Sequence, residues 1–218
     1  MLIERFVWLA VGLPLFWLST MFHEMAHAWA AYALGERGIP RRWLTSFDPR
    51  LYVDTLGSVL FGLTWLSGTF FLEGIRYVGF GWGRSVEFRP GALRHPQRDM
   101  LLVALAGPLC NLLQAVLWYG LGRWVGPSSP PVADVAFTAS ALNLVLATFN
   151  LIPLPPLDGA TILANLLSRR GAVAMEGIQP GLAFLLLWVG LSVPAVSAFV
   201  LLPALWLGQL LGRLWGGG

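Results

Sequence analysis

The 218-residue chain is too apolar for an ordinary soluble domain, because 56% of its residues are hydrophobic, 11% are charged and its mean hydropathy is +0.68. Soluble domains are roughly a quarter charged, so this composition predicts a protein embedded in a membrane. The net charge of +3 comes from Arg alone, with acidic residues interspersed. This distribution excludes the basic tract typical of a nucleic-acid-binding protein. The single Cys110 excludes an intramolecular disulfide.

Several apolar stretches approach or exceed the roughly 20 residues that a helix needs to cross a bilayer. We therefore expect an all-α polytopic membrane protein, a bundle of about five to six transmembrane helices with one helix broken by proline. The length predicts a single membrane-embedded domain over residues 1–218, with a core at 5–168 and C-terminal helices at 179–214.

The first helix is expected from Arg5 to Leu34, because Gly35 follows the apolar run. The next apolar stretch, Leu56–Leu72, is slightly shorter than a full crossing and rich in glycine. It either spans the membrane or enters and returns, and the pattern leaves both open. Within the polar connection at 73–99, Arg84–Arg89 alternates like a strand, which predicts a possible short β-ribbon.

A third span is expected from Asp99 to Trp124, and a fourth from Val132. The fourth is interrupted at Asn150–Gly159, because prolines there remove amide donors and cannot continue a helix. In lipid, such a break persists only where protein or a wet cavity satisfies the freed backbone groups. A helix should resume at Gly159.

The resumed helix is expected to end near Ser168–Gly171. The last apolar region, Pro180–Leu214, contains Pro194 and Pro203, which predict a division into two helices.

The first helix contains His23, Glu24 and His27, the HExxH pattern of zinc hydrolases. Positions i and i+4 share a helix face, so both imidazoles can reach one ion, while Glu24 lies near enough to act on its water. Ionisable groups inside a membrane are costly, about 2.5–3.5 kcal/mol each at mid-span, and a shared divalent metal compensates them. The alternative is a polar packing cluster without a metal.

Two histidines leave a tetrahedral catalytic ion short of a third protein ligand. Asp158 is the best candidate, because it follows the proline break, where a cavity is expected. Its alternative role is an N-cap of the resumed helix. Asp54, Asp99 and Asp134 lie at span edges and are interpreted as caps or solvated charges.

Three motifs in the same order resemble the site-2 protease family of intramembrane zinc metalloproteases. They are His23–His27 (HEMAH), Ala106–Asn111 (AGPLCN) and Asn150–Gly159 (NLIPLPPLDG), and Gly79–Gly83 also resembles a family segment. The chain departs from the family pattern at Arg84-Ser85-Val86, where relatives commonly have Lys-Pro-Val. A length of 218 residues predicts a short form without a PDZ domain.

The resemblance implies regulated intramembrane proteolysis with one zinc ion held by His23, His27 and Asp158 and with Glu24 as the catalytic base. The substrate would be a transmembrane or signal-peptide-like segment, and the location a prokaryotic inner membrane, as a multi-pass protein in the lipid bilayer. Asn150 is a candidate for stabilising the oxyanion or positioning substrate, with a structural role as the alternative. Asn111 is interpreted as a structural residue that hydrogen-bonds between helices.

Two rival functions remain open at this level: a catalytically silent membrane binding or chaperone homologue, and a metal transporter. Transporters tend to show paired repeats with broken helices, whereas this sequence has one broken helix and no repeat. Membrane orientation depends on the Leu56–Leu72 stretch. If this stretch is a full crossing, both termini lie on the face with more Arg, which favours cytoplasmic termini.

Overall fold

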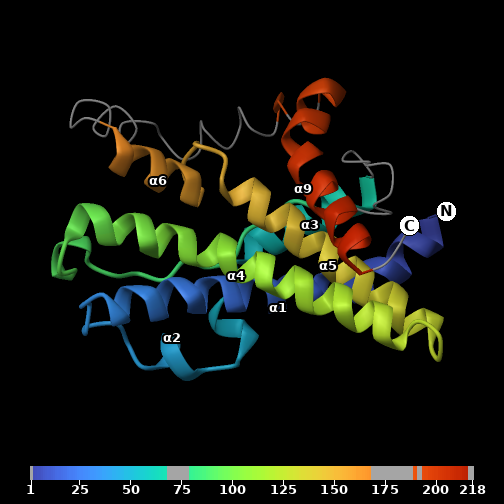
Figure 1. Cartoon of the computed structure of the whole chain (residues 1–218), viewed down its shortest axis with the longest axis horizontal. Coiled ribbons are helices and arrows are strands. Elements are labelled where there is room, and N and C mark those ends of the chain that lie inside the picture. The colour runs from blue at the N-terminus through green and yellow to red at the C-terminus, as the bar shows by residue number, and fades with distance from the viewer. Residues whose placement is uncertain (1, 68–78, 168–188, 191–192, 216–218) are drawn as a thin grey trace.

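The computed structural model describes residues 2–67, 79–167, 189–190 and 193–215. Within these ranges every regular element is a helix (Figure 1). In chain order they are α1 (Leu2–Ala33), α2 (Arg42–Thr45), the 3-10 helix η1 (Pro49–Leu51), α3 (Thr55–Ser67), the 3-10 helix η2 (Pro90–Ala92), α4 (Pro96–Val125), α5 (Pro130–Asn150), α6 (Asp158–Leu166) and α9 (Pro194–Leu214).

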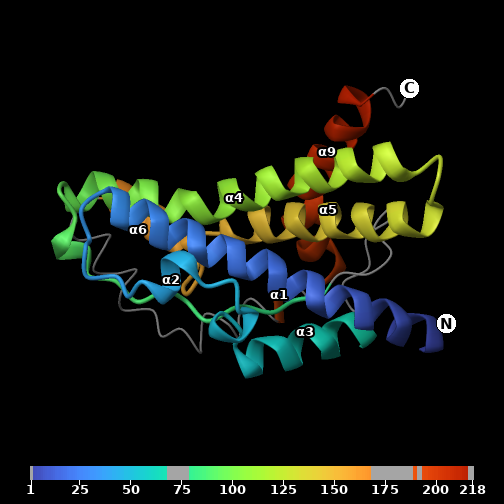
Figure 2. The ribbon, with the colours of Figure 1, turned by 90° about the horizontal axis from the view of Figure 1, so that it is seen from below.

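Three helices of the described chain are long and apolar enough to cross a membrane: Ile3–Ala33, Pro96–Val125 and Pro130–Asn150. Figures 1 and 2 show α1, α4 and α5 side by side, with α4 running opposite in direction to both of the others. The helix α4 packs extensively on both α5 and α1. The expected all-helical architecture is confirmed for the described residues, with three helices that could cross a membrane, whereas the expected five to six spans are not confirmed.

Proline sets the start of three helices. Pro96, Pro130 and Pro194 each occupy a first-turn position, where the missing amide hydrogen has no helical partner to lose. For this reason α4 and α5 begin a few residues before the expected Asp99 and Val132.

The prediction that Pro203 divides the last apolar region is wrong, because α9 runs through it. Proline is tolerated inside apolar helices where neighbouring protein compensates the freed backbone groups, and α9 packs on α5. The first part of the expected C-terminal pair, 179–188, lies outside the described residues, as do Ser168–Gly171.

The loop between α1 and α3 folds back along α1. The Trp29 indole on α1 donates to the Leu44 carbonyl at 2.8 Å, and Arg84 N donates to Tyr52 O at 2.7 Å. Beside the latter contact lies a single antiparallel bridge between Val53 and Gly83, and residues 84–89 form no strand. Pairing in the described residues around the expected ribbon is therefore limited to this bridge.

The helix α3 covers most of the expected Leu56–Leu72 stretch, whose last residues, 68–72, lie outside the described part. Its 13 residues rise about 20 Å, which is shorter than the hydrocarbon core of a bilayer. After α3 the chain returns to the end of α1, since Arg94 N donates to Leu34 O at 3.1 Å. The segments before and after α3 thus lie at the same end of the bundle.

Buried apolar clusters surround the centre of the bundle. One joins α4, α5 and α9, a second joins α1 with the loops at 39–52 and 86–93, and a third joins α1, α3 and α5. On the outer face of α4, by contrast, Leu109, Leu113 and Leu117 are each more than half exposed at four-residue spacing. Such a stripe suits contact with lipid.

Candidate metal centre

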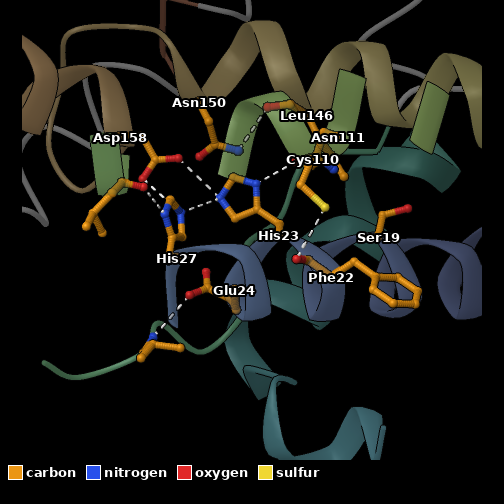
Figure 3. Close-up of polar contacts among 12 residues, drawn as sticks. Ser19, Phe22, His23, Glu24, His27, Cys110, Asn111, Leu146, Asn150 and Asp158 are labelled. Atoms are coloured by element: carbon orange, nitrogen blue, oxygen red, sulfur yellow. Dashed lines mark hydrogen bonds and ion pairs between the residues drawn. The ribbon is translucent and has the colours of Figure 1, made fainter. Parts of the chain in front are cut away.

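His23 and His27 lie one turn apart on α1 and face Asp158, the first residue of α6 (Figure 3). Their Nε2 atoms are 3.0 Å apart. Asp158 Oδ2 lies 3.2 Å from Nε2 of His23, and Asp158 Oδ1 lies 3.3 Å from Nε2 of His27. The structure therefore brings together the two imidazoles and the distant carboxylate that the sequence singled out.

The position of Asp158 follows from how α5 ends. The chain leaves α5 at Asn150, turns through the proline segment and re-enters a helix at Asp158. A Cβ on Gly159 would lie 2.3 Å from Leu151 O, so only glycine lets α6 start this close to the end of α5. Asp158 itself makes no capping bond, because the N-cap residue is Leu157 and the carboxylate faces the histidines.

Hydrogen bonds on the far side of each ring fix the histidine tautomers. His27 Nδ1 donates to the Val103 carbonyl at 2.7 Å, since a carbonyl can only accept. His23 Nδ1 donates to Asn111 Oδ1, because the Asn111 amide nitrogen is directed to Asn143. In the neutral rings both Nε2 atoms consequently carry lone pairs, and these atoms face each other and the carboxylate.

Three converging acceptors favour a positive charge between them, which a metal ion can supply. The candidate ligand atoms lie within 4.8 Å of one another, and the buried Asp158 Oδ2 accepts no hydrogen bond. Ligands of a tetrahedral zinc ion at about 2.0–2.1 Å are roughly 3.3 Å apart, close to the separations found here. Two His and one carboxylate also form the donor set of a catalytic zinc site, which keeps a fourth position open. The residues fit a zinc ion.

Gly107 on α4 leaves space for the two histidine rings. A Cβ at this position would lie 2.4 Å from Nε2 of His27 and 2.6 Å from Nε2 of His23. No side chain other than hydrogen fits there, so α4 can approach the imidazole pair with its bare backbone. The glycine of the AGPLCN motif is thus part of the site.

Glu24 is buried beside His27 (Figure 3), and Val86 N donates to its Oε2 at 3.1 Å. This bond ties the carboxylate to the segment at 79–86. Burial, together with the charge of Glu24, raises the pKa of Tyr52 to about 12. The Tyr52 hydroxyl therefore stays protonated and donates to Ser46 O at 3.1 Å.

A cavity of about 90 Å³ opens beside these groups. Its walls come from α1, α4, the end of α5 and the segment at 80–85, and they include His23, Glu24, Asn150 and Asp158. The cavity has polar and apolar walls and adjoins Glu24 as well as the candidate ligands His23 and Asp158. A more open hollow beside α6 shares Pro156 and Leu157 with it as a common wall.

The remaining polar residues from the sequence occupy different places. Asn150 lines the cavity, and its Nδ2 donates to Leu146 O at 2.9 Å. Asn111 bonds to α1 and α5 at once, through His23 and Asn143. Asp54 caps α3 by accepting from Gly57 N at 2.8 Å. Asp99 accepts from His95 N at the start of α4, and Asp134 is solvent-exposed on α5.

Sequence reasoning missed four contributors: Gly107, Asn143, and the backbone groups of Val86 and Val103. A polar Asn143 in the middle of an apolar helix was a signal that could have been used, as was the glycine of AGPLCN. Backbone donors and acceptors leave no trace in the sequence.

Comparison with known proteins places these features in a family. Residues 127–192 match the model of peptidase family M50. The "Putative zinc metalloprotease YwhC" of Bacillus subtilis (strain 168) is 29% identical over 217 residues, covering 93% of this chain and 91% of that protein. The "Putative zinc metalloprotease Rip2" of Mycobacterium tuberculosis (strain H37Rv) is 30% identical over 200 residues, covering 90% and 72%. No solved structure matches significantly.

Proposed function

We propose, from the premise that this chain belongs to peptidase family M50, the site-2 proteases, and is a zinc metalloprotease, that it cuts peptide bonds within or near transmembrane segments. One observation carries the proposal. The His23, His27 and Asp158 cluster and Glu24 are held between helices long and apolar enough to span a bilayer. A substrate that reaches this site has to come from the membrane or its boundary.

His23, His27 and Asp158 are the proposed zinc ligands. Gly107 leaves the space that the histidines need, and Asn111 Oδ1 and Val103 O, which accept from the two Nδ1 atoms, set their tautomers. Bound there, zinc would supply a Lewis acid for the scissile carbonyl and a water of lowered pKa, about 7.

Glu24 is the proposed general base. It lies in the same cavity wall as His23 and Asp158, and the amide of Val86 holds its Oε2. Such a carboxylate can take a proton from the attacking water and deliver it to the leaving amine. The departure from the family pattern at Ser85 leaves this contact intact, because the donor is the backbone of Val86.

A transmembrane helix hides its carbonyls in its own hydrogen bonds, so the substrate has to unwind locally before it can be cut. The non-helical segment between α5 and α6 lines the cavity at Pro156 and Leu157. We propose that an extended substrate pairs with this segment by strand addition. The hollow on the other side of Pro156 and Leu157 offers space for residues flanking the cut.

Asn150 stays a candidate for positioning the substrate or steadying an oxyanion. One hydrogen of its amide nitrogen is directed to Leu146 O, and the second remains available toward the cavity that Asn150 lines. Its structural alternative, holding the last turn of α5, rests on the same bond.

For the whole chain we propose a single multi-pass domain in a prokaryotic inner membrane, with about five to six membrane-inserted helices including short ones. The helix α3 fits a re-entrant element better than a crossing, because of its length and because the chain on both sides of it lies at one end of the bundle.

The direct test is cleavage by the purified protein in lipid vesicles. The substrates are a model transmembrane segment and a water-soluble peptide carrying the same scissile sequence. Wild type should cut the vesicle-embedded segment at a site mapped by mass spectrometry, and Glu24→Gln should cut neither while keeping its zinc. Cleavage restricted to the soluble peptide would contradict the intramembrane proposal, and full activity of Glu24→Gln would contradict the base.

A further inference from the structure

A chain of buried hydrogen bonds leads away from the metal centre and returns to the helix it started from. It runs from His23 on α1 to Asn111 on α4, to Asn143 on α5, and back to Ser19 on α1. Asn111 and Asn143 are fully buried, and Ser19 is 2% exposed. Buried amides in an apolar bundle are costly unless every group is paired, so the direction of each bond is well defined.

The direction is fixed at the end far from the metal centre. Asn143 Nδ2 donates to the carbonyl of Ala139 at 2.9 Å and to Ser19 Oγ at 2.9 Å. A carbonyl cannot donate, so the amide nitrogen has to be on this side and Asn143 Oδ1 on the other. Oδ1 then accepts from Asn111 Nδ2 at 2.8 Å.

The same logic continues to the ligand. With its nitrogen directed to Asn143, Asn111 has only Oδ1 to offer His23. His23 Nδ1 therefore has to carry the hydrogen. In the neutral ring this leaves the lone pair on Nε2, the atom that faces His27 and Asp158.

We propose that Asn143 is a positioning residue that sets the metal-binding tautomer of His23 through Asn111, an inference that rests on the proposed zinc ligands. Without Asn143 the amide of Asn111 is free to turn over and present its NH2 group to His23. Nδ1 would then have to accept, and the ring hydrogen would move to Nε2, where it blocks the metal.

His27 provides an internal comparison. Its Nδ1 donates directly to the backbone carbonyl of Val103, whose polarity cannot reverse. Loss of Asn143 should therefore disturb the tautomer of His23 and leave that of His27 unchanged. A general loosening of the bundle would affect both rings.

The first experiment uses metal-free protein labelled with 15N-histidine, recorded at increasing pH until each ring shows one protonated and one bare nitrogen. The chain has 3 histidines, and the exposed His95 can be replaced by Gln to leave two ring systems. Wild type should show His23 with its hydrogen on Nδ1. Asn143→Leu should show His23 partly or wholly with hydrogen on Nε2, while His27 keeps its Nδ1 hydrogen.

The second readout is zinc affinity, measured by competition with a chelator. Loss of an outer-shell partner typically weakens metal binding roughly 10- to 100-fold, and we expect Asn143→Leu to fall in this range. Ser19→Ala is the matched control, because Asn143 keeps its bond to Ala139 O and hence its orientation. This control should retain the wild-type tautomer and affinity.

A rescue variant separates orientation from packing. In Asn111→Asp/Asn143→Leu the Asp side chain has no NH2 group, and in its ionised form it can only accept from His23 Nδ1. The double variant should recover the Nδ1 tautomer and zinc affinity relative to Asn143→Leu alone. An unchanged tautomer in Asn143→Leu, or a double variant no better than the single one, would overturn the proposal. Asp158→Ala in the same titration tests the ligand set separately, since the tautomer is read without metal.

Discussion

At the scale of single residues, the site depends on which atoms can approach the two imidazoles. The HExxH spacing by itself predicts that His23 and His27 share a helix face, because that relation is set within one turn. The need for Gly107 could not be predicted in the same way, since it arises from the approach of a second helix. The role of Asn143 likewise depends on its hydrogen bond with Asn111, which lies 32 positions away in sequence.

Gly107→Ala should weaken zinc binding without unfolding the protein. The added methyl carbon would lie 2.4 Å from Nε2 of His27 and 2.6 Å from Nε2 of His23, so both rings would have to shift. Overpacking of this kind costs about 1–3 kcal/mol, and each 1.4 kcal/mol, roughly, weakens affinity about tenfold. Chelator competition measures the effect. Gly208→Ala on α9, where the new Cβ would be 3.6 Å from its nearest neighbour, is the control and should bind zinc normally. Equal affinities in the two variants would refute the steric role of Gly107.

At the scale of elements, proline and glycine positions explain where prediction succeeded and where it did not. The break at Asn150–Gly159 was predictable, because consecutive prolines cannot donate helical hydrogen bonds. The continuity of α9 through Pro203 was not, because apolar helices can accommodate an internal proline. The short β-ribbon suggested by residues 84–89 is not confirmed, because pairing in the described residues there is limited to the Val53–Gly83 bridge. The segment at 79–86 instead contacts α3 and α1.

The contact between α3 and the segment at 79–86 is predicted to control Glu24. A Cβ on Gly57 would lie 2.2 Å from Trp82 O, so Gly57→Ala has to displace the segment whose Val86 amide holds Glu24. We expect a lower cleavage rate with normal zinc content, together with a loss of stability of about 1–3 kcal/mol. Gly62→Ala on the same helix meets its nearest atom at 3.9 Å and should leave cleavage unaffected. Matching activities for the two variants would show that this contact does not position the base.

At the scale of the whole molecule, most described Arg residues gather at one end of the bundle. This end carries the first part of the loop after α1, the segment just before α4 and the start of α4, with Arg37, Arg41, Arg42, Arg89, Arg94 and Arg98. At the other end, Arg123 contacts Trp215 O near the end of α9. The sequence alone could not give this distribution, because it depends on α3 returning the chain to the end it left.

The positive-inside rule then predicts that the Arg-rich end, toward which α1 carries His23 and His27, faces the cytoplasm. This replaces the orientation that follows from treating Leu56–Leu72 as a full crossing. In a Cys110→Ala background, Arg41→Cys should resist a membrane-impermeant maleimide in intact cells. Ser128→Cys, between α4 and α5, should be labelled. The reverse labelling pattern would place the Arg-rich end outside.

The measurement that tests the central claim most directly is the zinc content of purified wild type, Asp158→Ala and Glu24→Gln, taken beside their cleavage of a vesicle-embedded substrate. The account predicts one zinc per wild-type chain with cleavage, loss of both in Asp158→Ala, and retained zinc without cleavage in Glu24→Gln. Wild-type zinc binding by Asp158→Ala would contradict it, because the carboxylate that α6 brings to the histidines would then not be a ligand.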